Sequence, residues 1–363
     1  MRVLLAGGGT AGHTSPLLAT ADALRRARAD IDVVCLGTER GIETRVVPAA
    51  GYQLELISPV PLPRTPSPDL ARVPYRLWSA VRETRALIAR LRPDVVVGFG
   101  GYVCTPAYLA ARAAKVPIVI HEGNALPGLA NRVGARVAAV VATSFPDTRL
   151  RGARFIGLPI RRAISSLDRA EMRELAQAHF GLRAGLPTLL VTGGSQGARS
   201  INDAVSGAAQ DLGAAGVQVL HVQGPRGTVT VPEAAGDADA PPFVVVSYVD
   251  RMELAYAAAD AVVGRAGANS VTEAAVLGLP AVFVPLPHGN GEQVLNARAV
   301  IEAGGGILVA DADFTASWVR DNLPALLNSP ARLEQMSRAA SGLIRGDADD
   351  ALAQLVIDAG SRP

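Results

Sequence analysis

Short apolar runs and longer amphipathic stretches alternate along the first half of the chain. The runs are three to five residues long, as expected of strands buried on both faces of a sheet. They are Val3–Ala6, Val33–Leu36, Val95–Phe99, Ile118–Ile120 and Ala139–Val141. Between them, stretches such as Pro16–Arg28 and Pro74–Leu91 place apolar residues at helical spacing. This order of strand and helix predicts a parallel sheet with helices on both faces.

The same pattern restarts near Thr188. The strands predicted there are Thr188–Thr192, Val217–Val222, Phe243–Val246, Ala261–Val263 and Ala281–Val284. In each half the first strand leads into a glycine-rich loop, at Gly7–His13 and at Gly193–Gly197, and then into a helix. Two such openings predict an α/β protein with two Rossmann-like domains facing a central cleft. One large sheet with an insertion is the alternative.

Composition agrees with this organisation and narrows the function. The 363 residues suffice for about two domains of ~150 residues each, and the 49% hydrophobic content suits a globular protein. A net charge of +2 does not indicate a nucleic-acid binder. Cys35 and Cys104 form neither a metal pattern nor a disulfide framework, which fits a reducing cytoplasm. Glycines and a proline interrupt both long uncharged stretches, so we expect membrane contact only at the surface.

The first glycine loop matches G-x-G-x-x-G at Gly7, Gly9 and Gly12. Alone, this motif indicates only backbone amides close to a ligand at a helix start, often a phosphate. A dinucleotide site also needs an acidic residue at the end of the second strand, where Glu39 comes late. His13 lies at the mouth of the first strand. It either removes a proton from an alcohol or shapes the loop.

Three stretches of the second half suggest contacts with a nucleotide sugar. The loop Gly193–Gly197 offers amides and the Ser195 hydroxyl to a phosphate, or is simply a tight turn. In Arg265–Glu273, we expect Asn269 or Ser270 to cap a helix and Glu273 to reach a ribose. The alternative role for Glu273 is to stabilise the helix by complementing its dipole. The polar stretch 288–293 suits sugar hydroxyls or is an ordinary loop.

Acidic residues give no sign of a metal-held diphosphate. Asp311 and Asp313 have the Asp-x-Asp spacing, but they lie beside a predicted helix start and are interpreted as a cap. Helix ends and arginine would then stabilise a leaving diphosphate.

Together, eight stretches resemble the family of UDP-N-acetylglucosamine (UDP-GlcNAc) transferases that convert lipid I to lipid II in peptidoglycan synthesis. They keep the family's order and extend over nearly the whole chain, which makes the resemblance specific. The stretches are GGGTAGH (7–13), GFGGYVCTP (98–106), HEGNALPGLANR (121–132), GLPIR (157–161), TGGSQGARSIN (192–202), YVDRM (248–252), RAGANSVTEAAVLGLPAVFVPLP (265–287) and GNGEQVLNA (289–297).

The resemblance implies a GT-B fold, inversion at the sugar carbon, and neither a metal nor another cofactor. It implies an acceptor- and membrane-facing domain at residues 1–160 and a UDP-GlcNAc-binding domain at residues 161–344. A C-terminal helix at about 345–363 is expected to pack back on the first domain. The implied partners are UDP-GlcNAc, lipid I and the anionic inner-membrane surface, at the cytoplasmic face of the cell membrane, together with cell-wall synthesis complexes.

Roles of individual residues follow from the same resemblance. Val249 would hold the uracil through its backbone, Glu273 the ribose, and Gln293 with Glu292 the GlcNAc hydroxyls. The remaining donor-binding residues, at or near the diphosphate, are Arg161, Ser195, Gln196, Ala268, Asn269 and Ser270. The acceptor side would be lined by Thr10, Ala11, Gly12, His13, Tyr102 and Asn124.

Three positions depart from the family pattern. Ala11 stands where the family usually has glycine, so we expect the loop to approach the acceptor less closely. Leu158 replaces an asparagine before Pro159, and Asn269 replaces an apolar residue. Neither of these two changes the expected reaction class.

His13 is the expected general base, and Glu122 is the fallback. The stretch Pro74–Leu91 combines apolar residues, among them Trp78, with several arginines, and it is either a membrane-docking ridge or an ordinary core helix. A UDP-GlcNAc 2-epimerase, an NAD-dependent oxidoreductase and a non-catalytic nucleotide-sugar module remain as alternative functions.

Overall fold

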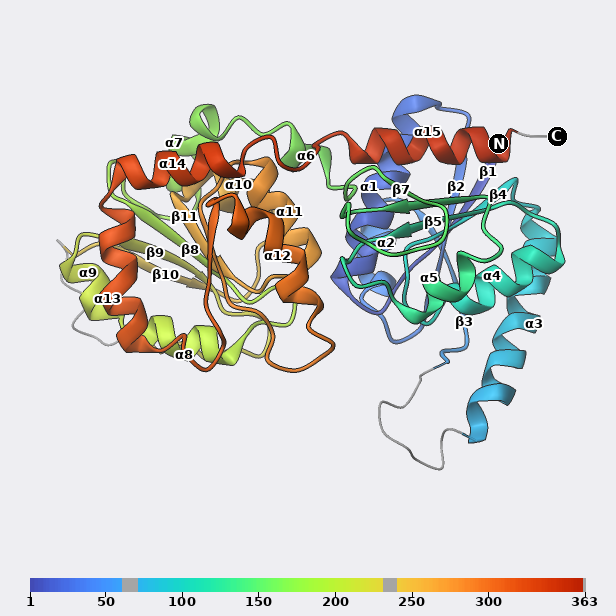
Figure 1. Cartoon of the computed structure of the whole chain (residues 1–363), viewed down its shortest axis with the longest axis horizontal. Coiled ribbons are helices and arrows are strands. Elements are labelled where there is room, and N and C mark those ends of the chain that lie inside the picture. The colour runs from blue at the N-terminus through green and yellow to red at the C-terminus, as the bar shows by residue number, and fades with distance from the viewer. Residues whose placement is uncertain (61–70, 231–239, 362–363) are drawn as a thin grey trace. The chain divides into compact units, whose positions relative to one another are not determined.

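The computed structural model describes residues 1–60, 71–230 and 240–361. The chain forms two compact units (Figure 1). Unit 1 contains the chain up to Arg161 and again from Gly346 onward, and unit 2 contains Arg162–Arg345. The division falls one residue beyond the boundary expected from the sequence.

Unit 1 is built on one parallel sheet with the strand order β3-β2-β1-β4-β5-β6-β7. The strands are β1 (Arg2–Ala6), β2 (Asp32–Thr38), β3 (Gln53–Ile57), β4 (Val95–Gly98), β5 (Ile118–Glu122), β6 (Val140–Thr143) and β7 (Ala153–Phe155). The chain starts in the interior of the sheet at β1, adds β2 and β3 on one side, and then adds β4 to β7 on the other side, as in a doubly wound nucleotide-binding sheet.

Alternate residues of the strands enter the two cores of unit 1. Val3 and Leu5 of β1 belong to one core, whereas Leu4 and Ala6 belong to the other. Helices cover both faces: α1 (Ala11–Ala27), α2 (Glu43–Ala49), α3 (Val73–Leu91), α4 (Cys104–Ala113), α5 (Leu129–Gly134) and α15 (Ala348–Gly360). The last of these, from the end of the chain, packs along α1 (Figure 1). An ion pair of 2.5 Å between Arg26 and the buried Asp349 joins the two helices.

Unit 2 repeats the plan with a second parallel sheet in the order β10-β9-β8-β11-β12-β13. Its strands are β8 (Thr188–Thr192), β9 (Gln218–Val222), β10 (Phe243–Val246), β11 (Ala261–Gly264), β12 (Ala281–Phe283) and β13 (Gly306–Leu308). Its helices are α6 (Arg162–Ser165), α7 (Arg169–His179), α8 (Arg199–Gly207), α9 (Ala209–Ala214), α10 (Met252–Ala258), α11 (Ala268–Val276), α12 (Glu292–Glu302), α13 (Ala316–Leu327) and α14 (Pro330–Ala340). The prediction of two Rossmann-like sheets is therefore confirmed, and the single large sheet is wrong.

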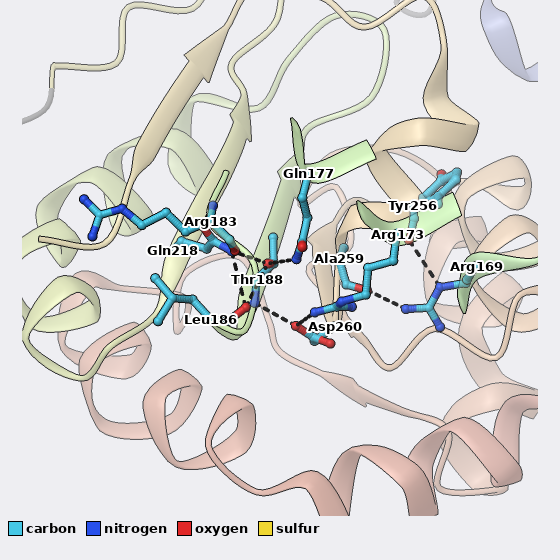
Figure 2. Close-up of polar contacts among 10 residues, drawn as sticks. All are labelled: Arg169, Arg173, Gln177, Arg183, Leu186, Thr188, Gln218, Tyr256, Ala259 and Asp260. Atoms are coloured by element: carbon cyan, nitrogen blue, oxygen red, sulfur yellow. Dashed lines mark hydrogen bonds and ion pairs between the residues drawn. The ribbon is translucent and has the colours of Figure 1, made fainter. Parts of the chain in front are cut away.

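Helix α7 ties the start of unit 2 to the amino-terminal edge of its sheet (Figure 2). Arg173 forms an ion pair of 2.8 Å with Asp260, whose carboxylate also accepts the Thr188 amide at 2.8 Å. Arg169 donates to the backbone carbonyls of Tyr256 and Ala259. The network joins α7 to the first residues of β8 and to the turn before β11, and so anchors the beginning of unit 2 to its own sheet.

Candidate active site

The carboxyl ends of β1, β4 and β5 are neighbours in unit 1, because these parallel strands are adjacent in the sheet. A Cβ atom on Gly100, after β4, would lie only 3.0 Å from Cδ2 and Nε2 of His13. A Cβ atom on Gly123, after β5, would lie 3.9 Å from the carbonyl oxygen of Gly12. The loops after β4 and β5 therefore converge on the first turn of α1, which follows β1.

His13 is half-buried in that first turn. Its Nδ1 lies 3.2 Å from the carbonyl oxygen of Gly8 and 3.4 Å from the hydroxyl of Thr10. A carbonyl oxygen only accepts hydrogen bonds, so the bond to Gly8 requires the proton on Nδ1. The neutral ring then carries its lone pair on Nε2, the nitrogen that a general base would use.

The other expected acceptor residues lie at the start of α1 or on the loops that follow β4 and β5. Thr10 and Gly12 are exposed, and Ala11 and Asn124 are half-buried. Tyr102 is 49% exposed and directly follows Gly101, where a Cβ atom would lie 3.4 Å from Nδ1 of His13. The loops that carry these five residues thus surround His13.

Glu122 occupies the end of β5 and is only 3% exposed. Its carboxylate accepts the backbone amides of Asn124 at 2.9 Å and Gly128 at 3.0 Å, and the side-chain amide of Asn131 at 2.9 Å. Burial raises the pKa of Glu122 above its usual value, while these three donors and nearby His13 oppose the rise. Because three donors already bond to this carboxylate, the geometry favours a structural role for Glu122, in which it shapes the loop that carries Asn124. It disfavours the fallback role of Glu122 as the general base.

The first glycine loop is already bonded to a carboxylate. The Gly9 amide donates to Glu43 at 2.8 Å, and Glu43 is completely buried. A negative charge bonded to the loop makes it a poor site for a pyrophosphate, which disfavours the dinucleotide interpretation. Glu39, the acidic residue considered for that role, is exposed instead. Sequence reasoning missed Glu43 because its partner lies 34 residues away.

Unit 2 places glycine-edged helix starts at the carboxyl ends of β8, β11 and β12. Helix α8 follows Gly193–Gly197, where a Cβ atom on Gly193 would lie 2.1 Å from the Ala198 amide nitrogen. Ser195 is half-buried in this loop, and exposed Gln196 accepts a hydrogen bond of 3.0 Å from Arg226. The N-cap residue, Ala198, has no side-chain oxygen to occupy the first amides of the helix.

Helix α11 begins differently from the prediction. Its N-cap is Gly267, in an extended conformation, and the helix starts at Ala268. Asn269 and Ser270 are therefore in the first turn, and the expectation that either caps the helix is wrong. Glu273 accepts a hydrogen bond of 2.7 Å from Tyr256, which is 3% exposed. The sequence did not indicate Tyr256 as the partner of Glu273, because the two residues are 17 positions apart.

Helix α12 starts after Gly291, whose φ of +78° favours glycine. The side chain of Gln293 accepts the Leu286 amide at 2.9 Å, so it closes the loop that precedes the helix. Glu292 and Gln293 line a pocket of about 40 Å³ formed by 285–286 and 288–294. Val249, the expected uracil contact, is 8% exposed in the turn after β10, and Arg161 is half-buried at the end of unit 1.

Asp311 is not a helix cap, which corrects the prediction. Helix α13 is capped by the Thr315 hydroxyl, which accepts the Trp318 amide at 3.2 Å. Asp311 instead pairs with Arg265 and accepts the Ser200 hydroxyl at 2.6 Å. Burial raises the pKa of Asp311, but the bonds from Ser200 and Arg265 outweigh it and lower that pKa below its usual value. This ion pair joins the segment before α11 to the segment before α13.

Helix α3 exposes two aromatic side chains near its start. Tyr75 is 71% exposed and Trp78 is 59% exposed, and their rings stack with centroids 6.3 Å apart. The Arg82 guanidinium lies 5.7 Å from the centre of the Trp78 ring. Later apolar residues of the helix, Leu87, Ile88 and Leu91, are buried in the core. The sequence stretch thus combines a core half and an exposed aromatic half.

Within 1–60, 71–230 and 240–361, no three histidine, cysteine or acidic side chains are grouped as a metal site would need. Over the same part of the chain, no helix has the length and apolarity needed to span a bilayer.

The architecture is that of GT-B glycosyltransferases. A crystal structure of Acinetobacter baumannii MurG superposes with a TM-score of 0.75 at 28% identity, over 98% of this chain and 99% of that one. The UDP-GlcNAc 2-epimerase of Neisseria meningitidis, solved with UDP-GlcNAc, gives 0.68 at 14% identity, over 99% and 100% of the two chains. The second likeness extends to the fold alone.

The chain belongs to glycosyltransferase family 28. The N-terminal domain model of that family matches residues 3–143, and its C-terminal domain model matches residues 188–352. A Nocardioides relative is 63% identical over 99% of this chain and 98% of its own length. A Streptomyces avermitilis relative is 56% identical over the same shares. Both relatives are UDP-N-acetylglucosamine–N-acetylmuramyl-(pentapeptide) pyrophosphoryl-undecaprenol N-acetylglucosamine transferases.

Proposed function

We propose that this chain transfers N-acetylglucosamine from UDP-GlcNAc to the muramyl sugar of lipid I, undecaprenyl-pyrophosphoryl-MurNAc-pentapeptide, and so produces lipid II. The observation that carries the proposal is the 63% identity, over nearly full length, to a relative with that activity in its name. The GT-B fold and the family 28 domains support the same class of reaction.

Unit 2 is proposed to hold the donor. Helices α8, α11 and α12 start at neighbouring strand ends, and their N-cap residues supply no side-chain hydrogen bond. In α12 the first amide, of Glu292, already donates to the Asn290 side chain at 3.2 Å. The first amides of α8 and α11, with the positive end of each helix dipole, suit a diphosphate without a metal ion. Ser195, Gln196 and the first turn of α11, at 268–270, would contact the phosphates or lie beside them. Arg161, the last residue of unit 1 before unit 2 begins, keeps its expected role at the diphosphate from the family motif alone.

The rest of the donor fits side chains of the same unit. Glu273 would accept hydrogen bonds from the ribose hydroxyls, with the Tyr256 bond fixing its position. Val249 would bind the uracil through its backbone, and Glu292 with Gln293 would contact the GlcNAc hydroxyls. These roles rest on the family motif and on the placement of all four residues at the carboxyl side of the unit 2 sheet.

Unit 1 is proposed to hold the acceptor, with His13 as the base. Nε2 of His13 accepts the proton of the attacking sugar hydroxyl as its oxygen bonds to the anomeric carbon of GlcNAc. The bond from that carbon to the UDP oxygen breaks, its electron pair leaves with UDP, and the configuration inverts. Thr10, Ala11, Gly12, Tyr102 and Asn124 would surround the acceptor sugar.

The lipid of the acceptor remains in a membrane, and α3 is the proposed contact with it. Tyr75 and Trp78 would enter the headgroup region, while Arg82 and neighbouring arginines would meet anionic lipid at about 1 kcal/mol per charge. This contact would place the protein at the cytoplasmic face of the cell membrane.

Vesicle binding tests the membrane contact. Trp78→Glu should reduce co-sedimentation with vesicles containing anionic lipid severalfold. Leu175→Glu is the matched control, because Leu175 is 56% exposed on α7 of unit 2. Equal binding by the two variants would refute docking through α3.

One assay tests the proposed reaction. Radiolabelled UDP-GlcNAc is incubated with a lipid I analogue, and the expected product is a lipid-linked disaccharide. Conversion of the donor to its 2-epimer without need of acceptor would replace the proposal with the epimerase alternative. UDP binding without turnover would replace it with a non-catalytic module.

A further inference from the structure

Glu43 is a fully buried carboxylate that the proposed reaction does not use. One oxygen accepts the Gly9 amide at 2.8 Å, and the other accepts the Thr38 amide at 3.0 Å and the Thr38 hydroxyl at 3.1 Å. Both oxygens therefore accept hydrogen bonds from backbone amides.

The backbone around Glu43 is built to admit it. A Cβ atom on Gly8 would lie 2.3 Å from a carboxylate oxygen of Glu43, and one on Gly41 would lie 1.8 Å away. A Cβ atom on Gly37 would lie 2.5 Å from its side-chain Cγ. Glu43 is the first residue of α2, where the helix dipole alone favours an acid. That dipole would not require the side chain to be enclosed by three glycines.

The two ends of a single peptide group connect Glu43 to His13. The nitrogen that donates to Glu43 belongs to Gly9, and the oxygen that accepts from Nδ1 of His13 belongs to Gly8. Both atoms belong to the one peptide group that links Gly8 to Gly9. The bond is trans, so its N–H and C=O point in opposite directions. Gly9 has a φ of +87°, a region in which glycine rotates with little penalty, so the peptide needs an external partner to fix its orientation.

We propose that Glu43 is a positioning residue that fixes the Gly8–Gly9 peptide and, through it, the tautomer and orientation of the His13 ring. The carboxylate holds the N–H and polarises the peptide, which strengthens the carbonyl as an acceptor for Nδ1–H. The ring then presents Nε2 with its lone pair. Gly101 lies close to the same carbonyl, since a Cβ atom there would lie 2.7 Å from the Gly8 oxygen.

The consequence for catalysis rests on the proposed function, but the consequence for the imidazole does not. In the unmodified full chain with ¹⁵N-labelled histidine, the His13 signal, identified by its loss in His13→Ala, should report the Nδ1–H tautomer. In Glu43→Gln, the amide oxygen can accept the Gly9 N–H only if the NH₂ faces the Thr38 N–H, and the opposite orientation points the NH₂ at the Gly9 N–H. Neither orientation satisfies both amides, so the peptide is held less firmly and the Nε2–H tautomer should appear. A predominantly Nε2–H ring in the unmodified protein would overturn the inference without reference to activity.

Kinetics supply the second readout. Glu43→Gln should lower kcat by about 10²-fold, the scale of a misplaced catalytic group, and change the donor KM less than about threefold. The matched control is Thr38→Val, which removes one hydrogen bond from the other carboxylate oxygen and should leave kcat within about twofold. Equal losses in the two variants, or no loss in Glu43→Gln, would overturn the inference.

A double variant separates this inference from the proposed function. If His13 is the base, adding Glu43→Gln to His13→Ala should cause little further loss, because the two residues act as one unit. A full multiplicative loss would contradict action through His13. If His13→Ala alone leaves kcat unchanged, the proposed base is wrong, and the tautomer measurement still decides the role of Glu43.

Discussion

Replacing Tyr256 with phenylalanine should weaken donor binding through Glu273. The tyrosine is 3% exposed and donates a 2.7 Å hydrogen bond to the Glu273 carboxylate. A hydrogen bond to a charged group contributes about 1.5–3 kcal/mol. Glu273 is half-buried and recovers part of this from water, so we expect the lower end, and each 1.4 kcal/mol corresponds to about tenfold in affinity. Because the bond exists before UDP binds, only the part of this free energy that keeps Glu273 in position for the ribose affects binding, so the expected loss of UDP affinity is at most about tenfold.

Titration calorimetry with UDP and 2′-deoxy-UDP measures this effect. The unmodified protein should prefer UDP, and Tyr256→Phe should narrow the preference because the ribose contact is the one disturbed. Tyr52→Phe is the matched control: its hydroxyl donates to Asp22 at 2.5 Å in unit 1, so stability falls but UDP affinity does not. Unchanged UDP affinity in Tyr256→Phe would refute the positioning of Glu273 by Tyr256.

Three further outcomes are expected. His13→Ala should lower kcat by about 10²–10⁴-fold and leave the donor KM nearly constant, and initial rates within a few-fold of normal would exclude the base role. Asp260→Ala should destabilise unit 2 by about 1–3 kcal/mol in urea unfolding, whereas the exposed Asp321→Ala should cost less than about 0.5 kcal/mol; equal effects would contradict the α7 anchor. Burial lowers the pKa of both His121 and His221 to about 4, so the unfolded chain binds more protons between pH 6.5 and 4. Stability should be complete above pH 6.5 and fall toward pH 4 by up to about 1.4 kcal/mol per pH unit for each histidine, and a flat profile over that range would contradict their buried neutral state.

The sequence predicted most of the strands because their signals are local, but it did not indicate β3, β7 or β13. Every apolar run interpreted as a strand overlaps an observed strand in the sequence. The predicted helix Pro74–Leu91 corresponds to α3, Val73–Leu91. Helix α1 begins at Ala11, five residues before the expected start at Pro16, because the glycine loop enters the helix directly and Pro16 lies one turn inside. The helix caps were the weakest predictions, since Gly267 and Thr315 were overlooked in favour of nearby polar residues.

Periodicity and glycine spacing were sufficient by themselves to indicate two parallel sheets and the glycine loops and helix starts that position His13, Ser195 and Glu273. Those signals arise from backbone preferences and burial within a few neighbouring residues. Only the tertiary structure joined Gly9 to Glu43, 34 positions away, and Arg265 to Asp311, 46 positions away. Such pairs form because the sheet order brings distant loops to one edge, and the geometry that satisfies each buried charge exists only after the strands have paired.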